Sequence, residues 1–194
     1  MTQANVDNLK KQAEELEKQI LKDKKRLTEL RKQIPDEEVR DYTFKSVDGT
    51  TTNLSELFGE KTDLIVIHNM GEKCPYCTLW ADGFNGVVHH LENRASFVVI
   101  SPDEPQVQKE FAASRGWRFK MLSGHENSFA KDMGYNPKEG DYWPGVSAFY
   151  KTENGKIYRS GTAILGPGDD FCNVWHLFDL LKDGVNKWNP KYKY

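Results

Sequence analysis

The first thirty-odd residues carry one narrow apolar stripe. Apolar side chains recur at alternating spacings of three and four from Val6 to Ile34, with Asp23 at one seam position, and most other positions are Lys, Glu, Gln or Arg. This heptad spacing predicts a helix over about residues 5–34 that ends at Pro35. A stripe of this kind must be covered, either by the helix's own domain or by a second copy of the chain in a homodimer. The pattern leaves both alternatives open.

The rest of the chain alternates between extended and helical patterns. Nearly unbroken apolar runs predict central strands at residues 64–69, 96–100 and 146–150. Asp-Gly and Asn-Gly turns predict hairpins around residues 48–49 and 154–155. Helical spacing predicts helices at residues 78–91, 106–115, 128–133 and 170–182, the last with Val174, Leu177, Phe178 and Leu181 on its core face. We therefore expect an α/β domain over residues 37–194, a mixed central sheet with helices on both faces, preceded by a docking segment of residues 1–36.

Two cysteines stand where the first central strand gives way to a helix, in Cys74-Pro75-Tyr76-Cys77. A CxxC pair in a strand–CxxC–helix order is typical of a redox site. The first cysteine of such a pair lies at a helix N-terminus, where free N–H groups and the helix dipole favour the thiolate. Pro75 fits the first helical position, where its missing N–H costs nothing. The pattern predicts that Cys74 attacks a disulfide and that Cys77 resolves the mixed disulfide.

Composition narrows the classes of function. The chain has 194 residues and a formal charge of −2, a balance that gives no reason to expect nucleic acid or an anionic membrane as a partner. No apolar run approaches the roughly 20 residues of a membrane span, and the charged N-terminus does not resemble a secretory signal, so a cytoplasmic location is the expectation. Three cysteines are too few for a disulfide scaffold. No motif calls for a cofactor.

Several motifs together resemble the thioredoxin-like superfamily: the strand into Cys74–Cys77, the Trp143-Pro144-Gly145-Val146 run that opens a strand, and the hairpin through Asn154-Gly155. The stretches DYTFKSVDGTTTNLSELFG and FVVISPDEPQVQKEFAASRGWRFKMLSG look closer to the peroxiredoxin and thiol-reductase branch. The long basic helix, DYTF and CPYCTLWADGFNG together resemble a bacterial thioredoxin-like family catalogued as a domain of unknown function.

The resemblance implies a thiol–disulfide oxidoreductase with a protein or small-molecule disulfide as substrate and a thiol as electron donor. It implies that Pro144 is cis and faces the cysteine pair, with Tyr76 and Trp143 as apolar walls for the substrate. Peroxidase activity is not carried over, because peroxiredoxins place a threonine three residues before the attacking cysteine and this chain has Gly71 there.

Four further features remain open in the sequence. Asp82, five residues after Cys77, is either a buried proton acceptor for that thiol or an ordinary helix aspartate. Cys172 is either a third redox partner or a small buried hydrophobe. The loop Gly166–Asp170 either caps the last helix or binds glutathione. A non-catalytic module that binds zinc, copper or a protein partner is the rival to the enzyme, although no second Cys/His pair at metal-ligand spacing is present.

Overall fold

The computed structural model describes residues 2–194, and the chain divides into two units after Asp36. The first unit holds helix α1 (Gln3–Arg31), which confirms the predicted helix and ends three residues earlier than predicted. A proline disfavours helical geometry in the residue before it, so the chain leaves the helix ahead of Pro35. None of the described residues of α1 is buried. The partner of its apolar stripe therefore stays a prediction.

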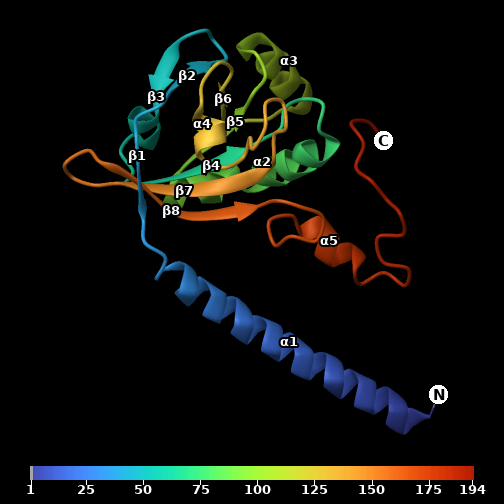
Figure 1. The fold of residues 1–194 in the computed structure, drawn as a ribbon. Helices are drawn as coiled ribbons and strands as arrows, with labels where there is room; N and C mark the ends of the chain where they lie inside the picture. Colours follow the sequence, from blue (N-terminus) through green and yellow to red (C-terminus); the bar gives the residue numbers. More distant parts are fainter. Residues whose placement is uncertain (1) are drawn as a thin grey trace. The chain divides into compact units, whose positions relative to one another are not determined.

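The second unit is built on one mixed sheet of eight strands, in the order β1-β8-β7-β4-β5-β6-β2-β3 (Figure 1). Strands β4, β5 and β6 are parallel neighbours, and every other neighbouring pair is antiparallel. This arrangement confirms the predicted thioredoxin-like α/β fold. The strands are β1 (Glu37–Val39), β2 (Thr43–Ser46), β3 (Thr51–Asn53), β4 (Asp63–His68), β5 (Ser96–Ser101), β6 (Lys120–Ser123), β7 (Gly145–Lys151) and β8 (Ile157–Ile164).

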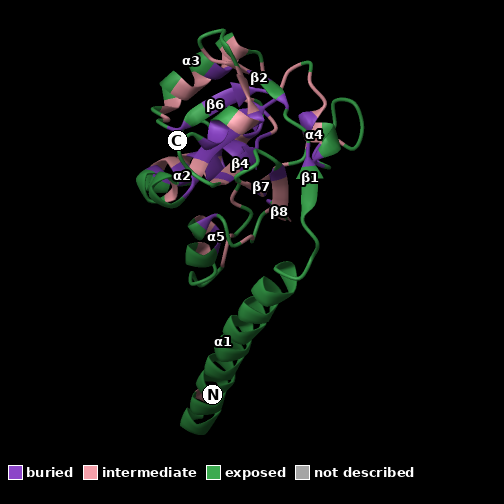
Figure 2. Ribbon diagram, turned by 90° about the vertical axis from the view of Figure 1, so that its left-hand side faces the viewer, coloured by how far each residue is buried: buried purple, intermediate pink, exposed green. Residues whose placement is uncertain are grey.

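Helices cover both faces of the sheet. They are the 3-10 helix η1 (Leu54–Phe58) and the α-helices α2 (Pro75–Arg94), α3 (Pro105–Arg115), α4 (Phe129–Asp132) and α5 (Asn173–Phe178). Alternate residues of β4 point to opposite faces, so Leu64 and Val66 pack in one cluster with Phe129 of α4, while Ile67 packs in another with Trp80 of α2. Figure 2 shows the buried residues concentrated on these central elements. Packing on both faces therefore holds β4 in place, and the loop that leads to α2 starts from the end of this strand.

Two elements differ from the sequence predictions. Strand β1 was not predicted, because three residues with two glutamates give no strand pattern; it pairs with β8, where Glu37 accepts from Arg159. Helix α5 is shorter than predicted and ends at Phe178. Its predicted core face is right only in part: Val174 packs against the core and Phe178 against Trp188, whereas Leu177 and Leu181 are exposed. Trp175, which was not predicted on that face, is buried.

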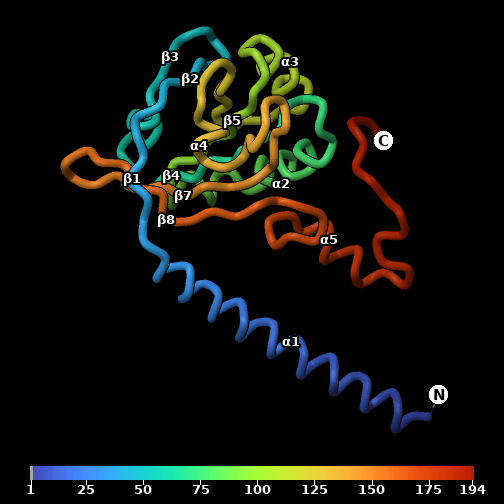
Figure 3. Tube along the Cα trace, viewed as in Figure 1, coloured from blue at the N-terminus to red at the C-terminus, as the bar shows by residue number. Residues whose placement is uncertain are grey.

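The last residues leave α5, turn, and run back toward α2 and α3, as the tube in Figure 3 shows. The reversal includes two consecutive non-glycine residues with left-handed backbone, Asn186 at φ 45° and Lys187 at φ 59°. Immediately after them the ring of Trp188 packs on Trp175 and Phe178, at centroid distances of 6.0 and 5.0 Å. This packing holds the end of the chain on the domain. Along residues 2–194 the structure contains no helix both long and apolar enough to cross a membrane.

Candidate active site

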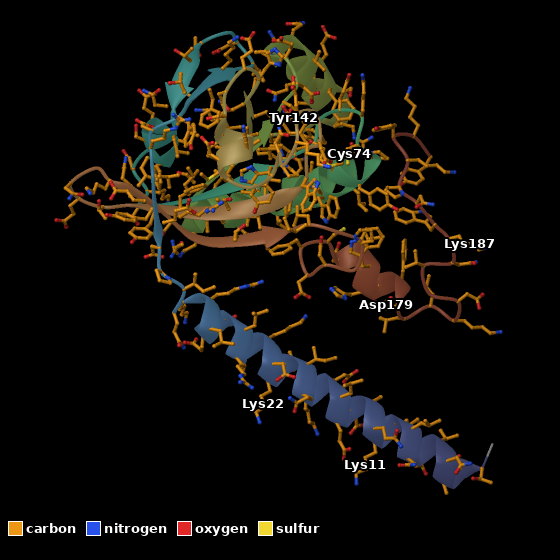
Figure 4. The ribbon with its side chains drawn as sticks, viewed as in Figure 1. Lys11, Lys22, Cys74, Tyr142, Asp179 and Lys187 are labelled. Atoms are coloured by element: carbon orange, nitrogen blue, oxygen red, sulfur yellow. The ribbon has the colours of Figure 1, made fainter. Side chains whose placement is uncertain are left out.

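The dithiol lies at the N-terminus of α2, directly after the loop that follows β4 (Figure 4). Cys74 is the N-cap of α2, and its Sγ accepts a hydrogen bond from the backbone N–H of Cys77 at 3.0 Å. Pro75 takes the first helical position, as predicted. The carbonyl oxygen of Cys74 accepts from both the backbone N–H and the Oγ1 hydroxyl of Thr78, at 3.1 and 3.0 Å. The first turn of α2 therefore orients the thiol of Cys74 toward the backbone N–H groups at the start of the helix.

The two thiols have opposite electrostatic environments. Hydrogen bonding from the Cys77 side chain, with help from the backbone N–H groups of Cys77 and Tyr76, lowers the pKa of Cys74 from 9.0 to about 7, against the opposing effect of burial. The pKa of Cys77 is strongly raised, first by its hydrogen bond to Cys74, then by burial and by the negative charge on Cys74. Cys74 is therefore the thiol of the pair that ionises first, near neutral pH, while Cys77 keeps its proton. Both are free cysteines, as is Cys172.

The carboxylate of Asp103 holds the loop that leads into Cys74. Its Oδ2 accepts from the backbone N–H of Glu72 at 2.9 Å and from the hydroxyl of Ser101 at 3.0 Å. The backbone N–H of Gly71 donates to Asn69 Oδ1 at 2.8 Å. A Cβ added to Gly71 would lie 2.6 Å from Asp103 Oδ1, and the φ of Gly71 is 105°, a conformation that side chains rarely adopt. Only glycine fits this approach to the dithiol.

Gly71→Ala should therefore lower the free energy of unfolding by about 2–4 kcal/mol, from backbone strain and the contact with Asp103. The matched control is Gly83→Ala in the exposed part of α2, where an added Cβ meets nothing within 4 Å. That control should stabilise the domain by about 0.5–1 kcal/mol, because alanine is the better helix former. Urea unfolding of both variants measures the difference. Equal stabilities would show that the contact between Gly71 and Asp103 does not constrain the loop.

Tyr76, between the two cysteines, packs in an aromatic group below the dithiol. Its ring lies 6.1 Å from that of Trp175 and 6.2 Å from that of Trp80, and its hydroxyl donates to Asn189 Oδ1 at 2.6 Å. Trp143 is 45% exposed and lines a small cavity with His68 and Asn69, at the end of β4. Tyr76 therefore lies at the dithiol, and the contact of Trp143 with a substrate stays a prediction.

The prediction that the bond before Pro144 is cis is wrong: the structure has no cis peptide bond anywhere in residues 2–194. The backbone on either side of this trans bond is hydrogen-bonded. The carbonyl of Pro144 accepts from Leu165 N at 3.0 Å, and Trp143 N donates to the carbonyl of Tyr135 at 2.8 Å. The first of these bonds continues the pairing of β7 with β8 into Pro144. The contact of Pro144 with a substrate stays a prediction.

Asp82 lies in an ion pair on the outer side of α2. Its carboxylate accepts from the Arg115 guanidinium through both oxygens, and Oδ1 also accepts from Trp117 Nε1 at 2.8 Å. Arg115 in turn donates to the backbone carbonyl of Tyr192 at 2.8 Å. Of the two alternatives for Asp82, the proton acceptor for Cys77 is the less favoured, because the carboxylate is already engaged in this ion pair. Through Arg115 it connects α2 to α3 and to the C-terminal residue Tyr192.

The remaining polar candidates are engaged in structural contacts. Asp169 Oδ1 accepts from the backbone N–H groups of Phe171 and Cys172, at 2.8 and 3.1 Å, and so shapes the turn before α5. The N-cap of α5 is Cys172, so Asp169 does not cap the helix itself. Cys172 is buried, and burial raises the pKa of its thiol. His68 lies 3.9 Å from the ring of Tyr135, and burial, with the charge of Arg159, lowers its pKa to about 3. In the described part of the chain, no three or more His, Cys, Asp or Glu side chains gather in a way that would hold a metal ion.

Sequence reasoning missed the C-terminal contacts and the role of Asp103. Asn189 and Tyr192 lie in an aromatic, lysine-rich stretch without periodicity, which carries no pattern that predicts a contact. Asp103 follows a predicted central strand in the run Ser101-Pro102-Asp103. Strand ends on the same edge of a parallel sheet lie close together, and this rule was the one signal that pointed Asp103 toward the loop before Cys74.

Solved structures with similar folds are peroxiredoxin-like. Peroxidoxin BcpB from Mycobacterium tuberculosis is 26% identical with a TM-score of 0.52, over 63% of this chain and 80% of that chain. A peroxiredoxin-like protein from Aquifex aeolicus is 18% identical with a TM-score of 0.54, over 67% and 75%. Reduced Prx3 of Vibrio vulnificus, in complex with H2O2, is 16% identical with a TM-score of 0.53, over 71% and 91%. These similarities agree with the thioredoxin-like fold.

Among curated proteins, no match was found. A family model described as "bacterial protein of unknown function (DUF899)" matches residues 3–194, which includes the N-terminal helix, the dithiol and the C-terminal segment. The chain therefore belongs to the DUF899 family, a family with a thioredoxin-like fold.

Proposed function

We propose that the protein is a dithiol–disulfide oxidoreductase in which Cys74 is the nucleophile and Cys77 the resolving thiol. The observation that carries the proposal is the hydrogen bonding at Cys74, whose sulfur accepts from the N–H of Cys77 at 3.0 Å and whose pKa is lowered to about 7. The thiolate is the form that attacks disulfides, and a pKa close to the ambient pH combines a large thiolate fraction with good nucleophilicity.

In the reductive direction, the Cys74 thiolate attacks one sulfur of a substrate disulfide. A bond forms between Cys74 Sγ and that sulfur, the substrate S–S bond breaks, and the other substrate sulfur leaves as a thiolate. Cys77 then loses its proton to solvent or to that leaving thiolate and attacks Cys74 Sγ. The second substrate thiol is released and a Cys74–Cys77 disulfide forms, so two electrons pass from the dithiol to the substrate. A thiol donor reverses this change on the enzyme.

Reduction of a peroxide is the second candidate, favoured by the similarity to peroxidoxin BcpB. In that reaction the Cys74 thiolate attacks one peroxide oxygen, the O–O bond breaks, and a sulfenic acid and an alcohol or water result. Cys77 would then displace water to give the same disulfide. The residue three positions before Cys74 is Gly71, which offers no hydroxyl to orient the peroxide. We therefore place disulfide exchange first.

The test gives reduced, metal-free protein a small aromatic disulfide or hydrogen peroxide in separate stopped-flow experiments. We expect the disulfide to react at least about a hundredfold faster than a free cysteine of ordinary pKa at pH 7, by thiolate fraction and by preorganised donors. Cys74→Ser should remove this rate, whereas Cys172→Ser, a change outside the dithiol, should keep it. A full rate in Cys74→Ser would overturn the assignment. A peroxide rate far above the disulfide rate would favour the second candidate.

A further inference from the structure

The C-terminal segment, residues 188–192, lies against the dithiol. Asn189 Oδ1 accepts from the hydroxyl of Tyr76, the residue between the two cysteines, at 2.6 Å. The carbonyl of Tyr192 accepts from Arg115 at 2.8 Å, and the ring of Tyr192 lies 6.2 Å from that of Phe111 of α3. The segment is therefore attached on two sides of the site, to the first turn of α2 and to the end of α3. Figure 4 shows Cys74 at the end of α2 nearest to this part of the chain.

Three anchors keep the segment in place. The first is the ring of Trp188, packed on Trp175 and Phe178. The second is Pro190, which is buried although its neighbours along the chain are exposed. The third is Arg115, whose guanidinium is held by Asp82 while it donates to the segment. A segment with a packed aromatic ring, a buried proline and an ion-paired donor behaves as a wall of the domain and not as a free tail.

The phenol of Tyr192 is within electrostatic reach of the sulfurs. Its pKa is raised, first by partial burial and then by the negative charges of Cys74, Cys77 and Glu72. Cys74 itself is only 7% exposed. Beside it a shallow groove of about 420 Å³ runs between Glu72 and the α3 side chains Val107, Glu110, Phe111 and Ser114. The ring of Phe111 contacts Tyr192, so the C-terminal segment also borders this groove.

Attack on a disulfide needs the thiolate to approach one sulfur along the S–S axis. A small disulfide meets this requirement through a narrow opening, whereas a protein disulfide brings two backbone segments with it. We propose that residues 188–192 are a specificity wall that admits small-molecule disulfides to Cys74 and excludes protein disulfides. The substrate class in this inference rests on the proposed dithiol function. The position of the wall beside Cys74 rests only on the geometry of the structure. Asn189 and Tyr192 are its positioning residues.

The first test measures access without any enzymatic turnover. Reduced chains in a Cys172→Ser background are alkylated with iodoacetamide or with a maleimide bearing a 5-kDa polyethylene glycol, where the size of the polymer is about that of a small peptide domain. Asn189→Ala in the full chain removes the hydrogen bond from Tyr76, which attaches the wall to α2. A chain that stops after Pro190 removes the hydrogen bond from Arg115 and the ring contact with Phe111, which attach the wall to α3. Trp188 and Pro190 remain in both variants. Lys193→Ala, an exposed change directly after the wall, is the control.

We expect the bulky maleimide to react about five- to tenfold faster with each wall variant than with the full chain, since one lost hydrogen bond shifts opening by about that factor. Iodoacetamide rates should change by less than about twofold, because the small reagent already reaches Cys74. The Lys193→Ala control should behave as the full chain. Equal maleimide rates in all four proteins would overturn the wall.

The second test measures turnover in the same four proteins, each with Cys74 and Cys77 intact. It compares reduction of a small aromatic disulfide with reduction of insulin, a protein disulfide. The wall predicts that the full chain reduces the small disulfide and spares insulin, and that both wall variants gain insulin reduction. Insulin reduction by the full chain at the rate of the shortened chain would overturn the substrate class. If maleimide access depends on the wall but neither disulfide reacts with any of the four proteins, the wall stands and the dithiol function is what fails.

Discussion

Cys77→Ser should convert a transient intermediate into a stable one. In this variant the Cys74 thiolate still attacks, but no second thiol displaces the substrate from Cys74 Sγ, so the mixed disulfide accumulates. We expect one equivalent of a small disulfide's thiol bound per chain, found as a mass increase in intact-protein mass spectrometry under non-reducing conditions and removed by dithiothreitol. The natural chain should show no adduct, because its Cys77 resolves the intermediate within the experiment.

Two matched variants make this result specific. Cys74→Ser should form no adduct, since the buried thiol of Cys77 has a strongly raised pKa and stays protonated at neutral pH. Cys172→Ser should behave as the natural chain, because Cys172 is buried at the start of α5. An adduct mapped to Cys172, or an adduct in Cys74→Ser as abundant as in Cys77→Ser, would contradict the assigned roles.

Removing the Cys77 thiol should also raise the pKa of Cys74. The hydrogen bond from Cys77 is the largest influence that lowers this pKa to about 7. At pH 7 about half of Cys74 is then thiolate, whereas a pKa of about 9 would leave about 1%. In Cys77→Ala we therefore expect the iodoacetamide rate at pH 7 to fall by about tenfold or more, with its midpoint moved toward pH 8–9. The backbone donors remain in this variant, so part of the shift persists.

The sign of the pH dependence follows from which form reacts. The alkylation rate of the natural chain should rise with pH through about 7 and level off above it, because the thiolate is already formed. A single titration near 9 in the natural chain would show that the α2 donors do not stabilise the thiolate. Identical midpoints in the natural chain and Cys77→Ala would assign the stabilisation to the backbone alone.

Local pattern was enough to predict the frame of the site. An apolar run that ends at residue 69, followed by Cys74-Pro75 and helical spacing, can place the first cysteine only at a helix N-terminus, and the structure has Cys74 as the N-cap of α2. The parallel pairing of β4 with β5 likewise follows from two apolar runs joined by a helix. These predictions hold because hydrophobic periodicity and helix capping depend on residues close together in the chain.

Contacts between residues far apart in the chain could not be predicted in the same way. Asp82 pairs with Arg115 and Trp117, which lie 33 and 35 residues further along. Tyr76 meets Asn189 across 113 residues, and the sequence around Asn189 carries no motif. The cis form of Pro144 was taken from a family resemblance, but the bond before Pro144 is trans in this chain. The side chains that position the dithiol could therefore be identified only in the folded structure, whereas the chemistry of the dithiol could be predicted from the sequence.

The redox equilibrium of Cys74 and Cys77 is the measurement that tests the account most directly. Metal-free protein is equilibrated in graded glutathione or dithiothreitol buffers, alkylated and read by mass spectrometry, with metal content determined on the same preparation. The account predicts a reversible Cys74–Cys77 disulfide with a midpoint between about −120 and −270 mV, the range of working dithiol oxidoreductases. A pair that resists oxidation and purifies with one equivalent of zinc or copper would contradict it and identify a metal-binding module.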